Sequence, residues 1–117
     1  IIKSIIRENS EVFVYVQGRM NHLEMEDIVY VEHCSRAVFM YTVKGVVHIP
    51  YISLQRILHV LGDDYLLQCH RSFLVNRIYI ETIDRTSNVV IMKNDMGKVA
   101  LGRKYKYSLL RQMHYIQ

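Results

Sequence analysis

The sequence predicts a mainly β domain, and three observations lead to that fold class. Apolar and polar residues alternate over many short segments, as the side chains of half-buried strands do. The five glycines lie where tight turns are expected between these segments. Only one segment shows a clear helical spacing of apolar residues, whereas parallel strands joined by helices would require several. The sheets are therefore expected to be antiparallel.

The first half of the chain contains three strand signals, at residues 11–17, 27–32 and 37–49. In the first signal, valines alternate with aromatic residues, and Gly18 closes the strand. The third signal is expected to be a hairpin, because Gly45 can supply the positive φ that a turn at residues 43–46 requires.

The clearest helix signal is Ser53–Leu61. Pro50 ends the preceding strand, Ser53 can cap the N-terminus of the helix, and Gly62 can end it. Four apolar residues recur at helical spacing: Leu54, Ile57, Leu58 and Leu61. We therefore expect one short helix at about residues 53–61 in an otherwise β-rich chain.

Strand signals resume in the second half, at residues 65–69, 78–84, 89–93 and 98–101. Polar turn residues separate the last three of these strands. From Arg103 onward the pattern is ambiguous. Tyr105, Leu109 and Met113 fit the stripe of a short C-terminal helix, but a short strand would suit the segment as well.

The segment Leu66–Arg77, with the sequence LLQCHRSFLVNR, interrupts an apolar run with polar residues. Arginine is almost never buried without a partner, so we expect the strand to end near Cys69. Residues 70–76 would then form a turn or a single helical loop above an apolar anchor. This loop would project three polar side chains outward, as a rigid recognition element does: His70, Arg71 and Asn76. A surface ion pair of the arginine, with the other two as capping residues, is an equal alternative from these residues alone.

Length and composition indicate one globular domain over residues 1–117, with enough apolar residues for an ordinary core. No apolar run approaches the ~20 residues of a membrane helix, and no signal peptide is visible. Cys34 and Cys69 are too few for a disulfide framework, which favours free thiols in a reducing, cytoplasmic compartment. Because the chain begins at Ile1 rather than Met, we expect it to be excised from a longer protein.

The net charge of +4 is unevenly distributed. Residues 1–60 hold six basic and six acidic side chains, whereas residues 61–117 hold nine basic and five acidic ones, a surplus of four. Five basic residues follow the last acidic one, Asp95: Lys98, Arg103, Lys104, Lys106 and Arg111. Such a segment is typical of proteins that bind polyanions, although a solvated face of a mildly basic protein would show the same pattern.

Metal and catalytic sites are not expected. The two adjacent Cys/His pairs, His33–Cys34 and Cys69–His70, lack the spacing of about two to four residues that zinc ligands usually show. A serine near a histidine in the chain is not a catalytic pair, because the base must reach the nucleophile in space with a third group orienting it. We therefore expect no enzyme, no metal and no cofactor.

Four segments together resemble the LytTR family of bacterial DNA-binding domains. They are HRSFLVN (70–76, after YLLQC), IVYVE (28–32), the helix at 54–61, and the closing stretch from Gly97 through LGRKY (101–105). Their order and spacing are similar to those of the family over about residues 12–115, nearly the whole chain. The sequence departs from the family at Gly102, where serine is usual, so one hydroxyl donor to a phosphate is absent.

The resemblance implies an elongated domain of small antiparallel sheets that inserts loops, rather than a recognition helix, into the major groove of double-stranded DNA. It also implies the C-terminal output domain of a response regulator, behind a receiver domain. Such domains commonly bind direct repeats as pairs, so a dimer on DNA is expected. No membrane partner and no small-molecule substrate are expected.

The resemblance also implies roles for individual residues. Arg71 and Arg103 match positions that read base edges, and arginine can bond bidentately to guanine. Arg36 lies in a third contact loop, at residues 33–36, whose length varies in the family. The other matched residues are expected to fix loops or contact phosphates: His70, Asn76, Lys104 and Lys106.

Two other classes of protein remain open at this point. The first is a β-rich module for single-stranded nucleic acid, in which Tyr105 and Tyr107, which lie among lysines, would stack on bases. The second is a protein-interaction module whose basic tail only aids solubility. The charge distribution and the order of the four segments favour double-stranded DNA over both.

Overall fold

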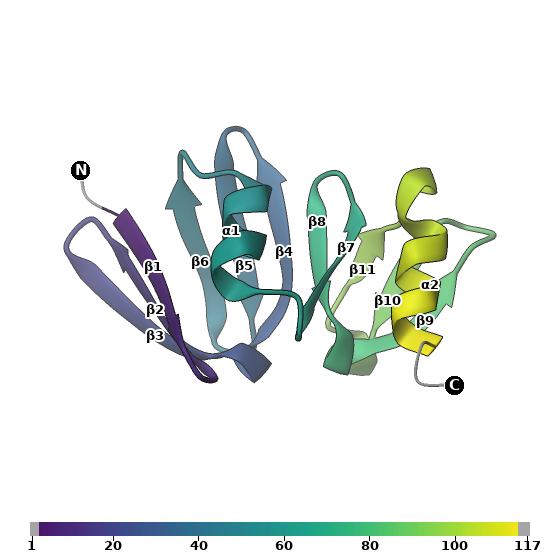
Figure 1. The fold of residues 1–117 in the computed structure, drawn as a ribbon, viewed down its shortest axis with the longest axis horizontal. Coiled ribbons are helices and arrows are strands. Elements are labelled where there is room, and N and C mark those ends of the chain that lie inside the picture. Colours follow the sequence, from purple (N-terminus) through teal and green to yellow (C-terminus); the bar gives the residue numbers. More distant parts are fainter. Residues whose placement is uncertain (1–2, 115–117) are drawn as a thin grey trace.

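The computed structural model describes residues 3–114, which form three small antiparallel sheets (Figure 1). The body is elongated and measures 43 × 29 × 25 Å along its principal axes. The predicted fold class, a mainly β and elongated domain, is confirmed. No helix among the described residues is long and apolar enough to cross a membrane.

The N-terminal sheet has the strand order β1–β2–β3, with β1 at Lys3–Glu8, β2 at Glu11–Val16 and β3 at Arg19–Glu24. Only β2 was predicted from the sequence. In β3, with the sequence RMNHLE, Leu23 is the single buried residue, because Arg19 and Asn21, which share its side of the strand, are polar, and the other face of the sheet meets solvent. A strand with one core-facing side chain lacks the alternation that identified β2.

The central sheet has the strand order β6–β5–β4–β8–β7. Its strands are β4 (Ile28–Cys34), β5 (Ala37–Thr42), β6 (Gly45–Pro50), β7 (Leu66–His70) and β8 (Phe73–Asn76). The hairpin predicted at residues 37–49 is confirmed as β5 and β6, and Gly45 has a φ of +127° at the turn. Few side chains other than glycine adopt that conformation, which explains the residue at this position.

The helix α1 (Leu54–Leu61) connects β6 to β7 and confirms the predicted helix. The Ser53 side chain caps it by accepting a hydrogen bond from the Arg56 amide at 3.0 Å. Gly62, with a φ of +80°, ends it through a hydrogen bond from its amide to the Leu58 carbonyl. Both capping residues have the roles expected from the sequence.

The C-terminal sheet has the strand order β11–β10–β9, with β9 at Ile80–Asp84, β10 at Val89–Met92 and β11 at Lys98–Ala100. A single 3₁₀ turn at Arg103–Tyr105 then leads into helix α2 (Lys106–His114). Of the two structures expected for the tail, the short helix is therefore the correct one. In Figure 1, α2 lies in front of the C-terminal sheet.

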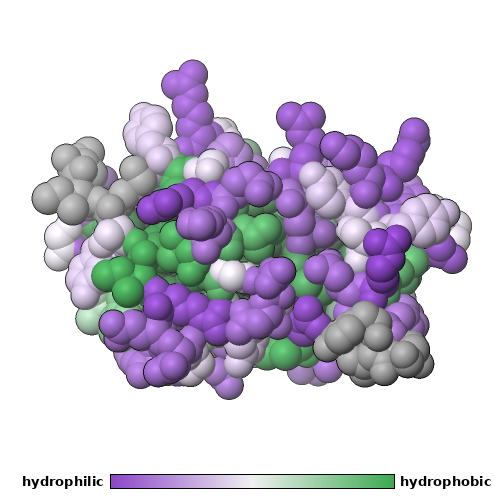
Figure 2. Space-filling view, in the orientation of Figure 1, coloured by the Kyte–Doolittle hydropathy of each residue, from purple (hydrophilic) through white to green (hydrophobic). Residues whose placement is uncertain are grey.

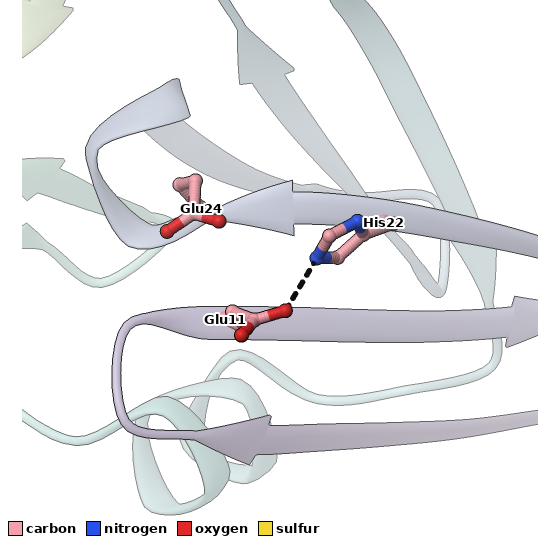
Figure 3. Close-up of side chains that lie close together, drawn as sticks. All are labelled: Glu11, His22 and Glu24. Atoms are coloured by element: carbon pink, nitrogen blue, oxygen red, sulfur yellow. Dashed lines mark hydrogen bonds and ion pairs between the residues drawn. The ribbon is translucent and has the colours of Figure 1, made fainter.

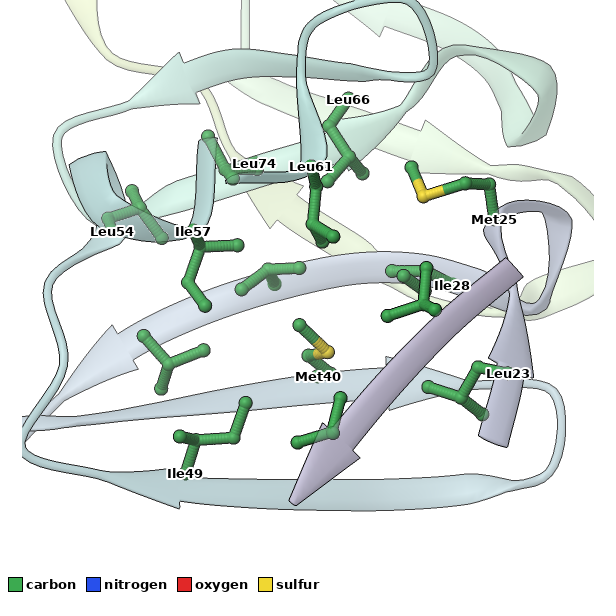
Figure 4. Close-up of a cluster of buried hydrophobic side chains, with 14 residues drawn as sticks. Leu23, Met25, Ile28, Met40, Ile49, Leu54, Ile57, Leu61, Leu66 and Leu74 are labelled. Atoms are coloured by element: carbon green, nitrogen blue, oxygen red, sulfur yellow. The ribbon is translucent and has the colours of Figure 1, made fainter. Parts of the chain in front are cut away.

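The described residues form two hydrophobic cores that share strands β4, β7 and β8. The first lies between the N-terminal sheet, α1 and the central sheet (Figure 4). The second lies between the central sheet, the C-terminal sheet and α2, where Leu109 is fully buried. Neighbouring residues of β8 belong to different cores, Leu74 to the first and Val75 to the second, because side chains alternate across a strand. Each shared strand therefore has one face in each core.

The structure corrects the prediction for residues 70–76. The strand β7 ends at His70, close to Cys69 as predicted, but residues 70–76 do not form a turn or helical loop, because β8 begins at Phe73. Only Arg71 and Ser72 form the turn between them, and the register shifts between Gln68 and His70. The apolar residues after the turn are a central strand paired with both β4 and β7, and not an anchor under a loop.

Arg7 of β1 ties the N-terminal sheet to the segment that follows α1. Its guanidinium donates hydrogen bonds to both carboxylate oxygens of Asp64, at 2.6 and 2.7 Å, and also to the Leu61 carbonyl. The hydrogen bond from Arg7 is the main reason that the pKa of Asp64 lies below its ordinary value.

We expect Asp64→Asn to lower the free energy of unfolding at neutral pH by up to about 1 kcal/mol. The effect is small because the Asp64 side chain is 57% exposed and solvent screens the pair. Since the pKa of Asp64 is lowered on folding, the ionised carboxylate stabilises the fold above its ordinary pKa. That contribution is lost as the pH falls through the lowered value.

Urea unfolding of both proteins over a pH series would measure this difference. The stabilities of the wild type and of Asp64→Asn should converge at acidic pH, and Asp63→Asn is the control because Asp63 is an exposed neighbour. A difference that stays constant down to the lowest pH would contradict the assignment to the Asp64 carboxylate.

Candidate nucleic-acid interface

Three connections lie along one edge of the molecule, the upper edge in Figure 1. They are the β4–β5 turn with Arg36, the β7–β8 turn with Arg71, and the 3₁₀ turn that begins at Arg103. Backbone hydrogen bonds join them in a row. The His33 amide donates to the Ser72 carbonyl at 2.9 Å, and the Gly102 amide donates to the Cys69 carbonyl at 2.7 Å. The three connections are therefore held side by side by the fold.

The β4–β5 turn presents Arg36 on a constrained backbone. Ser35 and Arg36 both have positive φ, 54° and 64°, which residues other than glycine rarely adopt. The Arg36 carbonyl accepts a hydrogen bond from the Tyr51 amide at 2.7 Å, so the segment after β6 braces this turn. The Arg36 side chain is exposed.

His70 fixes the β7–β8 turn from inside. Its Nδ1 accepts a hydrogen bond from the Ser72 amide at 3.0 Å, and its ring packs edge-on against Phe73. A neutral imidazole that accepts through Nδ1 carries its proton on Nε2, which is then free to donate. The exposed Arg71 lies in the turn itself, so this turn offers a guanidinium beside an imidazole donor.

The third connection approaches the second very closely because residue 102 is glycine. A Cβ at this position would lie 3.3 Å from the His70 Cα and 3.1 Å from a ring carbon of Tyr105. Glycine thus lets the chain pass directly beside β7 before it presents Arg103 and Lys104, both exposed. A larger residue at this position would require His70 or Tyr105 to shift by a few tenths of an ångström.

A hollow of about 400 Å³ lies between the second and third connections. Six residues line it: His70, Arg71, Gly102, Arg103, Lys104 and Tyr105. Hydrophilic side chains project from the same edge in Figure 2, whereas the apolar surface of that view lies across the middle of the body. The hollow therefore has a basic rim and suits an anionic group.

Within residues 3–114, the cations at this edge have no acidic side chain as an ion-pair partner. The ion pairs found in residues 3–114 involve Arg7, His22 and Lys44, all outside this edge. Four exposed basic side chains and the half-buried Lys106 are thus left for a polyanion: Arg36, Arg71, Arg103, Lys104 and Lys106. The structure brings together six of the seven residues that the sequence selected, these five and His70.

Asn76 is the exception, and the expectation that it projects outward is wrong. Its side chain has no solvent exposure and lies at the end of β8 away from the turn. Its Nδ2 donates to the carbonyls of Met25 at 3.1 Å and Ile28 at 2.8 Å, and its Oδ1 accepts from the Ile78 amide at 3.1 Å. A buried amide with partners at both ends stabilises the fold and has no surface to offer DNA.

The sequence reasoning missed Tyr51 at this edge. Tyr51 is 73% exposed, has a φ of +54°, and is bonded through its amide to the Arg36 turn. An exposed aromatic residue in a strained conformation is uncommon and favours a functional role. The only signal in the sequence was an aromatic residue directly after Pro50, which does not reveal its nearness to residue 36.

The two cysteines are free and differ strongly in environment. Cys69 is fully buried, and burial raises the pKa of its thiol to about 12. Its thiol donates to the Ala100 carbonyl at 3.4 Å, so it behaves as a core residue. Cys34 is exposed at the end of β4 beside the first turn.

Comparisons with known proteins agree with this geometry. A family model described as the LytTr DNA-binding domain matches residues 18–114. Among solved structures, the chain is similar to the LytTr DNA-binding domain of a methyl-accepting/DNA response regulator from Bacillus cereus, with a TM-score of 0.72 and 24% sequence identity. That likeness covers 91% of this chain and 97% of the other, and at this identity it supports the fold. No curated protein matches the chain.

Proposed function

The chain belongs to the LytTR family of DNA-binding domains, and on that premise we propose that it reads a specific sequence of double-stranded DNA with the loops of one edge. DNA binding follows from the family. The proposal adds that the β4–β5 turn, the β7–β8 turn and the segment from Arg103 enter the major groove.

One observation carries this proposal: each of the three connections presents an exposed arginine, and backbone hydrogen bonds hold the three in a row. The long axis of 43 Å exceeds the ~34–36 Å of one turn of B-DNA, so the body is long enough to lie along the duplex over about one helical turn. Helix α1 lies below the β4–β5 turn in Figure 1, and α2 reaches this edge only with its N-terminal end, at Lys106. Loop insertion therefore suits the geometry better than a recognition helix.

We divide the contacts by their chemistry. Arg71 and Arg103, with Arg36 as a third, are proposed to bond to base edges, because a guanidinium matches guanine O6 and N7 bidentately. The Nε2 donor of His70 and the ammonium groups of Lys104 and Lys106 are proposed to contact phosphates, which position the domain without reading sequence.

Lys104→Ala is expected to weaken binding to every duplex by a similar factor. An ammonium group on a phosphate releases about one counterion on binding, so the slope of log affinity against log salt should fall by about one unit. Fluorescence anisotropy on a specific and a random duplex, each over a salt series, measures both quantities. Lys93→Ala is a matched control, because Lys93 is exposed and follows β10. A loss confined to the specific duplex would instead make Lys104 a base-reading residue.

Selection of bound duplexes from a randomised pool, at moderate salt, tests the function itself. An enriched motif is the expected result, and two short repeats about one helical turn apart would support paired domains on direct repeats. If DNA is bound but no motif is enriched, Arg36, Arg71 and Arg103 contact phosphates and do not read bases. No bound DNA would contradict the proposal for the isolated chain.

The tyrosines distinguish duplex reading from the single-strand alternative. Tyr107 is 69% exposed on α2, whereas Tyr51 lies beside the Arg36 turn. We expect Tyr51→Ala to weaken duplex binding several-fold and Tyr107→Ala to leave it unchanged. Competition between duplex and single strand, measured with both variants, is the readout. A preference for the single strand that Tyr107→Ala abolishes would favour base stacking instead.

In its biological setting, we propose that the domain is the output module of a cytoplasmic transcription regulator. An upstream receiver or other regulatory domain would then control how two copies are brought together on DNA. Pairing on adjacent repeats combines the binding free energies of two modest interfaces, because binding of the second copy becomes intramolecular. The family membership supports this setting.

A further inference from the structure

The outer face of the N-terminal sheet carries a cluster of metal-ligating side chains that DNA binding does not use. Glu11 lies on β2, and His22 and Glu24 lie on β3 (Figure 3). One ligand atom from each of the three lies within 4.8 Å of the others. His22 Nε2 lies 2.9 Å from Glu11 Oε1, a separation at which two atoms can share one metal ion.

We propose that Glu11, His22 and Glu24 form a surface site for a divalent transition-metal ion, with Zn²⁺ as the best-fitting common ion. Imidazole nitrogen and carboxylate oxygen are usual zinc ligands, and three protein ligands leave the fourth position to water. Tetrahedral bonds of about 2.0–2.1 Å place ligand atoms roughly 3.3 Å apart, so small side-chain rotations close the site.

The strand pairing places three glutamates in one row across the N-terminal sheet, where a cation would be favourable. Glu11 lies directly opposite Glu8 of β1 on one side and Glu24 of β3 on the other. Like charges directly opposite each other across a sheet are destabilising. Among the described residues, no lysine or arginine pairs with any of the three, and the single ion pair of the row is the one with His22. A bound cation would remove this repulsion.

The ligands are also held in place by their neighbours. The His22 ring stacks on Phe13, with centroids 4.8 Å apart and planes within 6° of parallel. The Ser10 hydroxyl donates to Glu24 Oε1 at 3.0 Å, and the Asp27 amide also donates to the Glu24 carboxylate in a capping box, so these two bonds fix its orientation and a metal ion would use the acceptor sites that remain. Second partners of this kind orient ligands and contribute strongly to metal affinity. A bound ion would take the place of the hydrogen bond between His22 Nε2 and Glu11 Oε1.

The cluster lies at the opposite edge from the DNA-contacting turns, next to the β1–β2 connection (Figure 1). Zinc binding is therefore independent of the proposed function, and neither proposal depends on the other. The site would stabilise the N-terminal sheet, since an ion bridging β2 and β3 binds only the folded protein.

Calorimetric titration of the whole chain with Zn²⁺, in a Cys34→Ser background that removes the exposed thiol, tests the proposal. One equivalent of zinc is expected to bind, and His22→Gln should weaken that binding by at least about tenfold. His59→Gln is the matched control, because His59 is an exposed histidine on α1. Equal losses in the two variants, or no binding in the parent, would overturn the proposal and leave His22–Glu11 as a surface ion pair.

Thermal unfolding with and without Zn²⁺ provides a second readout. Zinc should raise the melting temperature of the parent and of His59→Gln, but not of His22→Gln or Glu11→Gln. Because these side chains are exposed, the variants should fold, and their melting temperatures without zinc check this. A zinc-induced rise that persists in both cluster variants would place the bound ion elsewhere and contradict the assignment.

Discussion

Replacement of Arg71 by alanine is expected to cost about 1–3 kcal/mol in affinity for the specific duplex and to relax the preference at one base pair. Arg71 lies at the tip of a two-residue turn, is exposed, and has no ion-pair partner among the described residues. Its backbone is fixed by the His70–Ser72 hydrogen bond and by the β7–β8 pairing. The backbone of the turn thus holds the Arg71 side chain in a fixed position. Truncation of this side chain removes a DNA contact without disturbing the turn.

The measurement is a comparison of affinities for the selected duplex and for its single-base variants. Wild type should discriminate at the position that Arg71 reads, and Arg71→Ala should bind all four bases there alike. Arg85→Ala is the matched control, because Arg85 is an exposed arginine on the β9–β10 turn. If Arg71→Ala weakened specific and random duplexes equally, Arg71 would be a phosphate contact and the assigned role would be wrong.

Asn76→Ala is expected to lower the free energy of unfolding by about 3 kcal/mol, the largest stability effect that we predict. The fully buried side chain bonds to Met25, Ile28 and Ile78, which are up to 51 residues away in the chain. Alanine would leave buried polar groups without partners, and each such group costs about 1–3 kcal/mol. The loss is structural, so the folded fraction should retain its DNA affinity.

Urea unfolding measures the first quantity and DNA titration at low temperature measures the second. Asn21→Ala is a useful comparison, because Asn21 is a partly exposed asparagine on β3 and should cost much less. Normal stability together with lost DNA affinity in Asn76→Ala would reverse the assignment and restore the direct DNA contact that the sequence suggested.

The contrast between Arg71 and Asn76 shows what local pattern can and cannot predict. Both were expected to project from one loop, because seven consecutive residues were interpreted as a single turn. The structure divides them between a two-residue turn and a buried strand end. What separates them is the pairing of β8 with β4, a contact between residues more than forty positions apart. No periodicity within the segment contains that information.

Elements with strong local signals were predicted correctly. The helix at Ser53–Leu61 has a cap, a stripe and a terminating glycine, all of which are local in sequence. Strand β3 and the nearness of Tyr51 to Arg36 are set by long-range packing and were missed. The three ligands of the proposed zinc site were missed for the same reason, since Glu11 and His22 meet only when β2 pairs with β3.

The strands shared by the two cores have a consequence for cooperativity. Strands β4, β7 and β8 contribute side chains to both cores. If one core unfolds and these strands separate, the other core loses the same strands from its packing. The domain should therefore unfold in a single transition, without a half-folded state that retains one core. Arg36, Arg71 and Arg103 would then keep their mutual spacing at every temperature at which the protein is folded, and specificity would disappear together with the fold rather than before it.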